Sequence, residues 1–263
     1  MEVSDANCSE IQTIDRHTRG RYPTAIPPLS LRWQGARPPQ GGLCFFSAGD
    51  GLTGSGADRS IVYIDGFNLY YRALKGTKYK WLDLEKLCAQ LLPKLNILKI
   101  KYFTARIKSR PGDPNQPLRQ ELYLRALRTL PTVEIYYGRF LSKTSTFPLA
   151  PVTHPPQYVR VSHAEEKMSD VNLASHLLLD GFDNAYDVAA VISSDTDFIT
   201  PYKFVRNRFH KQIWILKPDK KPSVALRASV DAIKPIRKGS LASSQLPSVL
   251  HDSAGRIHKP NLW

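Results

Sequence analysis

IVYIDGFNLYY, residues 61–71, is the stretch of sequence that decides the fold. Four apolar residues, Ile61 to Ile64, lead directly to Asp65, and the turn residue Gly66 follows. A short apolar run that ends at a turn signal predicts a buried β-strand. An acid placed just after such a strand lies at the carboxyl edge of a parallel sheet, which is where α/β proteins bind their ligands.

Two further stretches carry acids in comparable positions. VAAVISSDTDF, residues 188–198, is a second apolar run that ends in acids, Asp195 and Asp197. KMSDVNLASHLL, residues 167–178, places Asp170 in the first turn of a predicted helix. Carboxylates that converge at a buried edge repel one another and are costly to desolvate, so such a group usually needs a cation. Hard ions that prefer oxygen ligands, Mg²⁺ or Mn²⁺, are the expected partners.

The pattern from Arg59 onward predicts the fold class. Strands are expected at 60–65, 97–107, 133–140, 187–194, 212–216 and 231–236, and helices at 84–92, 117–130, 169–180, 198–209 and 223–229. A proline-bearing insertion at 141–163 is expected to run over the surface. Strands that alternate with helices predict an α/β fold of three layers, with a mainly parallel central sheet and helices on both faces.

The two ends of the chain differ from this regular part. Residues 1–58 hold eight of the fifteen glycines and five of the twenty prolines, a composition typical of a disordered extension. The folded domain is expected over 59–238. Residues 239–263 are expected to form a polar, irregular tail that docks Trp263 back onto the domain.

The number and spacing of the cysteines and the hydropathy of the sequence indicate in which cellular compartment the protein is expected. The three cysteines form no CxxC pair, so the sequence supports neither a disulfide framework nor a cysteine zinc site, and Cys88 reads as a small core residue. We see no apolar run of bilayer-spanning length and no signal-peptide pattern. The expected setting is therefore cytoplasmic, without a membrane partner, and a homo-oligomer is compatible with the sequence.

Positive charge belongs to the predicted domain. Residues 59–263 hold 32 of the 37 lysines and arginines but 17 of the 23 aspartates and glutamates, a net of about +15. A basic surface around acidic clusters suggests a polyanion at the surface and a metal in the cleft, although a solvated basic surface that aids solubility explains the charge alone equally well. The expected RNA contacts are Arg72, Lys75 and Lys78 after the first acidic motif, and Arg106 and Lys108 at another strand end.

Each acid taken singly also has a structural explanation. Asp-Gly after a strand is an ordinary turn signal, and Asp170, Asp195 and Asp197 are all placed to cap helices. The occurrence of three such clusters at strand ends and at a helix start favours a metal site. Asn68, three residues after Asp65, adds an amide that can orient a metal-bound water or a phosphate oxygen without adding charge.

The motifs also resemble a known family. IVYIDGFNLYY, KMSDVNLASHLL and VISSDTDFITPY are similar, in order and spacing, to the NYN domains of the LabA-like (DUF88) group, within the PIN-like nuclease superfamily. The resemblance implies a Rossmann-like sheet with an acidic pocket that binds Mg²⁺ or Mn²⁺, and it implies cleavage of RNA at that pocket. The residues that match the family's pocket are Asp65, Asn68, Asp170, Asp195 and Asp197. One departure is Ser194, which stands where the motif more often has glycine.

These observations favour a metal-dependent ribonuclease. Asp65, Asp170 and Asp195 would hold the ion, Asp197 would be a further ligand or water-orienting base, and Asn68 would position water or phosphate. An RNA-binding or regulatory module with little or no turnover is the main alternative. A phosphohydrolase of small phosphate esters is a third hypothesis, but its Asp-x-Asp would be expected after the first strand rather than late in the chain.

Overall fold

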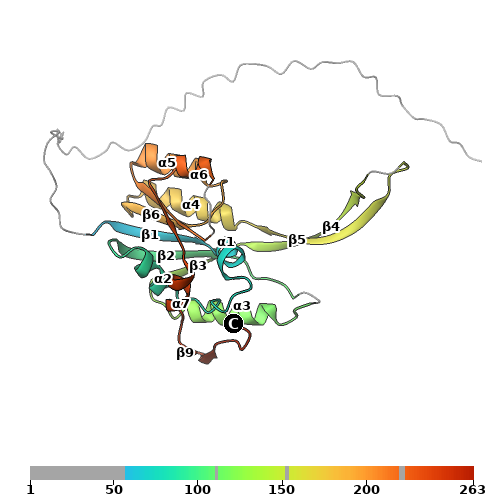
Figure 1. Ribbon diagram of the computed structural model, residues 1–263, viewed down its shortest axis with the longest axis horizontal. Helices are drawn as coiled ribbons and strands as arrows, with labels where there is room; N and C mark the ends of the chain where they lie inside the picture. The colour runs from blue at the N-terminus through green and yellow to red at the C-terminus, as the bar shows by residue number, and fades with distance from the viewer. Residues whose placement is uncertain (1–56, 110–111, 152–153, 219–222) are drawn as a thin grey trace, which may run out of the picture. The chain divides into compact units, whose positions relative to one another are not determined.

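A six-stranded parallel sheet forms the centre of the protein (Figure 1). The computed structural model describes residues 57–263 except 110–111, 152–153 and 219–222, so the predicted extension 1–58 lies almost wholly outside the described residues. In spatial order the strands are β3 (Val133–Tyr137), β2 (Asn96–Thr104), β1 (Arg59–Asp65), β6 (Val188–Ile192), β7 (Gln212–Lys217) and β8 (Ala232–Pro235). The predicted fold class, a three-layer α/β fold with a parallel sheet, is confirmed.

The two strands at the middle of the sheet contain the two apolar runs that end in acids. In β1 every residue after Arg59 is buried, and all five residues of β6 are buried. From β1 the chain builds the sheet outward through β2 and β3, and from β6 it builds the other half through β7 and β8. The strand order therefore reverses between β1 and β6, and such a switch point opens a crevice at the carboxyl ends of the two strands.

Helices cover both faces of the sheet (Figure 1). The core on one face includes side chains of α2 (Leu84–Leu91), α3 (Gln116–Leu127) and α7 (Lys238–Ser243). The core on the other face includes side chains of α4 (Ser169–Phe182), α5 (Ile199–Phe209) and α6 (Val224–Ala228). Cys88 is fully buried in the first core and its pKa is raised by that burial, which agrees with a packing role.

The predicted surface insertion is an ordered β-ribbon. Strands β4 (Arg139–Pro148) and β5 (Tyr158–Lys167) pair antiparallel over their whole length, from Arg139 opposite Lys167 to Pro148 opposite Tyr158. The ribbon projects away from the sheet and its helices (Figure 1). Threonine and valine alternate with polar residues on the two strands, as in a ribbon that is largely exposed on both sides.

The C-terminal segment is also more regular than the polar composition suggested. Residues 239–263, expected to be irregular, contain most of α7 and a hairpin of β9 (Val249–Asp252) and β10 (Gly255–His258). Its three buried apolar residues, Leu241, Leu246 and Ile257, join the core beside α2 and α3. Trp263 packs edge-on against Trp81, 6.2 Å between ring centroids, which confirms the predicted docking of the C-terminal tryptophan. Among the described residues no helix is both long and apolar enough to cross a membrane.

Candidate active site

The candidate site lies at the switch point between β1 and β6. Asp65 is the last residue of β1, and the chain then turns through the short helix α1 (Gly66–Leu69) into the π-helical turn η1 (Tyr70–Leu74). Asp195 follows β6 in the turn that leads to α5. Because β1 and β6 are neighbours in the sheet, their carboxyl ends bring the first and third acidic motifs to one place.

Hydrogen bonds tie the two turns together. Asp65 Oδ1 accepts the backbone N–H of Asn68 at 2.9 Å, and Asp65 Oδ2 accepts the hydroxyl of Ser193 at 3.2 Å. The backbone N–H of Ser194 donates to Asn68 Oδ1 at 3.1 Å. The amide oxygen of Asn68 therefore holds the β6–α5 turn against α1.

The second turn has its own local bonds. Asp195 Oδ1 accepts the backbone N–H of Asp197 at 3.0 Å, and the N–H of Asp195 donates to Ser193 Oγ at 3.1 Å. Positive φ values outside glycine occur, in the part of the chain that the structure describes, at Met168, Asn184 and His210. Ser194, at the position that departs from the motif, thus has a backbone conformation that accommodates a side chain.

Asp170 reaches the same cleft from α4. The residue before this helix, Met168, has a φ of 85° and marks the sharp bend between the ribbon and the helix. A non-glycine residue in this left-handed region is strained by roughly 1–2 kcal/mol, and such strain is concentrated at functional sites. The bend places Asp170 in the first turn of α4, at the edge of the cleft.

Glu166, at the end of the ribbon, is a fourth carboxylate that sequence reasoning missed. Its Oε1 accepts the hydroxyl of Ser169 at 2.7 Å and the backbone N–H of the same residue at 3.2 Å. A side chain on Gly138 would clash with Glu166 and with Ser169 Oγ, so the glycine lets strand β4 leave the sheet close to this acid. The signal in the sequence is the AEEK segment at 164–167, in which Glu166 stands four residues before Asp170.

These residues enclose an open cleft of about 370 Å³. Four carboxylates face it, and Asn68, Ala164 and three aromatic rings complete its wall. The full lining is Asp65, Phe67, Asn68, Tyr71, Phe140, Ala164, Glu166, Asp170 and Asp195. The structure thus brings together four of the five predicted pocket residues, while the exposed Asp197 stands outside this lining.

The charges in the cleft perturb one another. The pKa of Asp65 is raised from 3.8 to about 6. Burial is the main cause and the charges of Asp170 and Asp195 add to it, while the hydrogen bonds from Asn68 and Ser193 act in the opposite direction. The pKa of Asp170 is also raised, first by partial desolvation and then by Asp195, Glu166 and Asp197. Repulsion of this kind is relieved when a cation enters the group.

The donor set suits a hard divalent ion in its chemistry, since all the side chains offer oxygen. Among the described residues, however, no three histidine, cysteine, aspartate or glutamate side chains stand close enough to form a ready-made metal cluster. Mg²⁺ usually keeps several waters and takes only one or two carboxylates together with substrate phosphates. The spacing therefore fits a water-rich ion better than a closed protein cage.

A basic groove adjoins the acidic cleft. Arg106, Lys108 and Arg139 line it together with Tyr137 and Phe140, and Phe140 also lines the cleft. Lys108 Nζ donates to Ser142 Oγ at 3.2 Å, and the Arg106 guanidinium lies 5.3 Å from the ring centroid of Tyr137. Arg139 lies within the predicted strand 133–140, but the sequence did not mark it as an RNA contact, because its place beside Arg106 and Lys108 depends on the fold.

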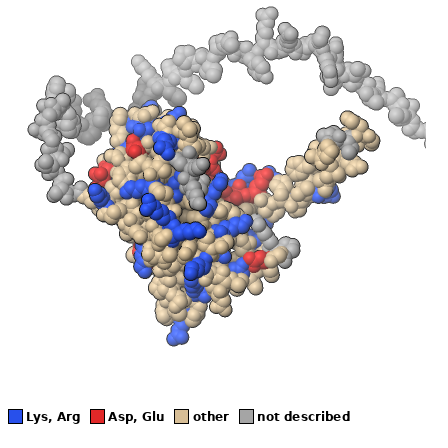
Figure 2. Space-filling model, in the orientation of Figure 1, with Lys and Arg blue, Asp and Glu red and all other residues tan. Residues whose placement is uncertain are grey.

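The other expected RNA contacts lie elsewhere. Arg72, Lys75 and Lys78 are exposed and line neither the cleft nor this groove, although Lys75 Nζ stands 5.1 Å from the ring centroid of Tyr71 at the cleft wall. Lysines and arginines are scattered over the visible body, and one group of acids lies near the base of the ribbon (Figure 2).

A parallel α/β sheet with carboxylates at its switch point defines a Rossmann-like protein with an acidic, oxygen-donor cleft. The NYN domain model matches residues 59–236, and the chain belongs to this family, which is part of the PIN-like nuclease superfamily.

The chain is also similar to one curated protein and to one solved structure. The chain is 32% identical over 239 residues to 6-hydroxy-3-succinoylpyridine 3-monooxygenase HspA of Pseudomonas putida (strain DSM 28022 / S16), over 78% of this chain and 75% of that protein. It is 16% identical to a crystal structure of a protein of unknown function from Vibrio parahaemolyticus, with a TM-score of 0.47, over 69% of this chain and 94% of that one.

Proposed function

We propose that this protein is a divalent-metal-dependent ribonuclease of the LabA-like (DUF88) group that hydrolyses RNA phosphodiester bonds at the acidic cleft. The observation that carries the proposal is the convergence of Asp65, Asp170 and Asp195 from three different elements, β1, α4 and the β6–α5 turn. The raised pKa values of Asp65 and Asp170 indicate an arrangement that is costly in the empty cleft and favourable once a cation neutralises it.

Each residue has a role that its position supports. Asp65, Asp170 and Asp195 would hold a hydrated Mg²⁺ or Mn²⁺, one or two of them directly and the rest through its bound waters, with Glu166 and Asp197 within electrostatic reach of Asp170. The ion supplies a more acidic bound water and neutralises charge on the phosphate, so no protein nucleophile is needed.

Two further groups would position the substrate. The Asn68 amide nitrogen would orient the water or a phosphate oxygen, while the basic groove of Arg106, Lys108 and Arg139 would hold the phosphate backbone beside the cleft.

Cleavage of labelled single-stranded and structured RNA with Mg²⁺ or Mn²⁺ tests the proposal. Asp65→Asn and Asp195→Asn are expected to lose cleavage, and EDTA is expected to abolish it in the wild type. Asp187→Asn is the matched control, because Asp187 precedes β6 at the opposite edge of the sheet and pairs with Arg59 at 2.9 Å. Cleavage that survives both cleft substitutions and excess EDTA would contradict the metal mechanism.

The same assay distinguishes the ribonuclease from an RNA-binding module. A regulatory module without turnover would bind RNA in a salt-sensitive manner and leave it intact at every metal concentration. The four carboxylates in the cleft count against this function, because a pure binder gains nothing from anions beside a phosphate.

Oxidation of a small aromatic ring is a second candidate function. It is favoured by the Pseudomonas relative, whose name describes a monooxygenase of a substituted pyridine, and by an aromatic-lined pocket next to the cleft. Monooxygenation consumes O₂ and two electrons, so the test is oxygen uptake with 6-hydroxy-3-succinoylpyridine and NADH. Uptake that depends on both compounds would support this function, and none above background would exclude this substrate.

A further inference from the structure

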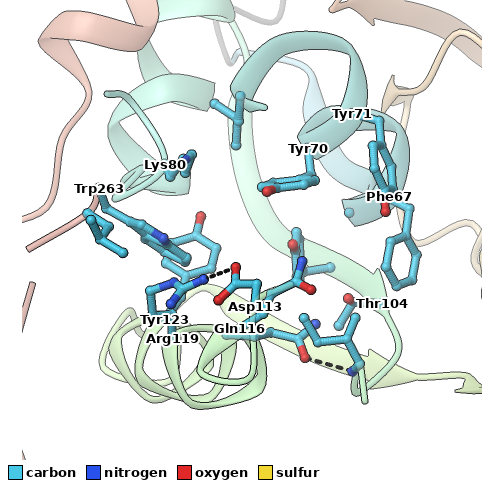
Figure 3. A pocket seen from close by; sticks show the side chains of 16 residues that line it. Phe67, Tyr70, Tyr71, Lys80, Thr104, Asp113, Gln116, Arg119, Tyr123 and Trp263 are labelled. Carbon is cyan, nitrogen blue, oxygen red and sulfur yellow. Dashed lines mark hydrogen bonds and ion pairs between the residues drawn. The ribbon is translucent and has the colours of Figure 1, made fainter. Parts of the chain in front are cut away.

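A second hollow is lined in part by the residues that directly follow Asp65, in α1 and η1 (Figure 3). We call it the aromatic pocket, because six of its lining side chains are rings: Phe67, Tyr70, Tyr71, Tyr102, Tyr123 and Trp263. They come from α1, η1, β2, α3 and the C-terminal end of the chain, and in the close-up they stand around a common space. None of these rings has a role in the mechanism proposed above.

The size of the pocket limits its occupant. Its volume is about 240 Å³. An apolar cavity of about 150 Å³ can hold benzene, and sites for drug-sized ligands begin at about 300 Å³. The aromatic pocket therefore fits one ring system with a short substituent, and it is too small for a stack of rings.

The wall of the pocket also offers hydrogen-bonding groups of both kinds. Arg119 Nη2 donates to Asp113 Oδ2 at the edge of the pocket, so a donor group and an acceptor group stand side by side (Figure 3). Gln120 is already used, since its Oε1 accepts the N–H of Ile107 and its Nε2 donates to the carbonyl of Ala105, both at 2.9 Å. A ring whose edge carries both donors and acceptors, as nucleobases do, matches this wall.

The aromatic pocket and the acidic cleft share a wall. Phe67 and Tyr71 line both, and Gly66 of the aromatic pocket follows Asp65 of the cleft directly. Because one turn of chain separates the two, a ligand with a phosphate in the cleft can place an attached ring in the pocket. A nucleotide unit of a single strand has this form, and its base is free to unstack.

We infer that the aromatic pocket binds one unstacked nucleobase of the RNA strand whose phosphate enters the acidic cleft. This inference rests on the proposed function, since it assigns RNA to the cleft. Tyr70 packs on the base from η1, and Asp113 and Arg119 meet its edge. The pocket thereby selects single-stranded RNA, because a base held in a duplex cannot enter it.

The test measures binding without cleavage, in EDTA at low salt. Two short single-stranded RNAs are compared by fluorescence anisotropy, one intact and one with abasic nucleotides, against wild type and Tyr70→Ala. Loss of base stacking is expected to weaken the binding of intact RNA by roughly 5- to 150-fold, and the abasic RNA is expected to show no further loss in the variant. Tyr70→Leu keeps apolar bulk and is expected to show the same pattern. Phe182→Ala removes a ring that is 74% exposed and is the control, with unchanged binding expected.

Several results would overturn the inference. Equal affinity of wild type and Tyr70→Ala for intact RNA would do so, and so would equal losses with intact and abasic RNA. Binding of a pyridine carboxylate such as nicotinate, without binding of nucleoside monophosphates, would assign the pocket to free aromatic acids. Failure of the nuclease proposal gives a different result. If the protein binds intact RNA more tightly than abasic RNA but never cuts RNA with Mg²⁺ or Mn²⁺, the nuclease function is contradicted and the base pocket is still supported.

Discussion

Asp65→Asn is expected to stabilise the metal-free protein at neutral pH. Burial and two neighbouring carboxylates raise the pKa of Asp65 from 3.8 to about 6 in the folded protein. Above pH 6 the folded state must carry this charge, whereas the unfolded state carries it at little cost. A difference of about two pKa units corresponds to about 3 kcal/mol of unfolding free energy, which the neutral asparagine regains.

Because the pKa of Asp65 is raised in the folded state, the stability difference between wild type and Asp65→Asn is expected to depend on pH. Between pH 4 and 6 the folded state binds more protons at this position than the unfolded state, so the contribution of Asp65 to stability falls as the pH rises. Below pH 4 the carboxyl is neutral in both states and the two proteins are expected to converge. Urea unfolding of wild type and Asp65→Asn from pH 4 to 8 in EDTA measures this difference.

Asp187→Asn is a control that is expected to change the free energy of unfolding in the opposite direction. The hydrogen bonds from Arg59 lower the pKa of Asp187 to about 2, so this substitution is expected to destabilise the protein at neutral pH, by less than about 1 kcal/mol because the pair is partly exposed. Its effect is expected to shrink as the pH falls toward 2. An Asp65→Asn protein that is no more stable than wild type at pH 7.5, or whose gain persists at pH 4, would refute the reasoning.

Two other substitutions test what holds the site in place. Lys101→Met is expected to lower the free energy of unfolding in urea by about 3–5 kcal/mol. Asp180 lies 2.7 Å from Lys101 and its side chain is only 15% exposed, so the substitution leaves a largely buried carboxylate without its cation. A double variant with Asp180→Leu that recovers no stability would contradict this reason. Gly66→Ala is expected to cost about 1–3 kcal/mol in thermal unfolding, because its new Cβ would lie 2.7 Å from the ring of Tyr102. Gly239→Ala, with nothing within 4 Å, is the control and is expected to be neutral.

The fold was predictable because local patterns and burial agree along most of the chain. Asp83, an acid directly before the predicted helix 84–92, caps α2 by accepting the N–H of Lys86 at 3.0 Å. The runs that end at Asp65 and Asp195 became the two central strands because both are apolar enough to be buried on both faces. The carboxyl ends of neighbouring parallel strands lie at the same edge of the sheet. The meeting of Asp65 and Asp195 in the cleft was therefore predictable from the sequence.

The parts that sequence could not supply depend on contacts between distant residues. Glu166 joins the cleft only because the ribbon pairs it with Phe140, 26 positions earlier, and no local pattern fixes that register. The aromatic pocket is closed by Trp263, whose ring centroid lies 5.7 Å from that of Tyr123. Whether a particular lysine borders a groove depends in the same way on the neighbouring element, as the different positions of Lys78 and Lys108 illustrate.

A purely structural interpretation of the acids explains part of the cleft. Asp65 does cap α1, and Asp195 does hold its own turn through the N–H of Asp197. Capping, however, leaves Asp170 unexplained, because α4 begins after Met168 without a side-chain cap and the Asp170 carboxylate faces other acids. A carboxylate that only capped a helix would gain from the backbone N–H it accepts, yet the pKa of Asp65 is raised in spite of that bond. The raised pKa values of Asp65 and Asp170 indicate that these charges stand together at a cost in stability, and the proposed divalent cation would offset that cost.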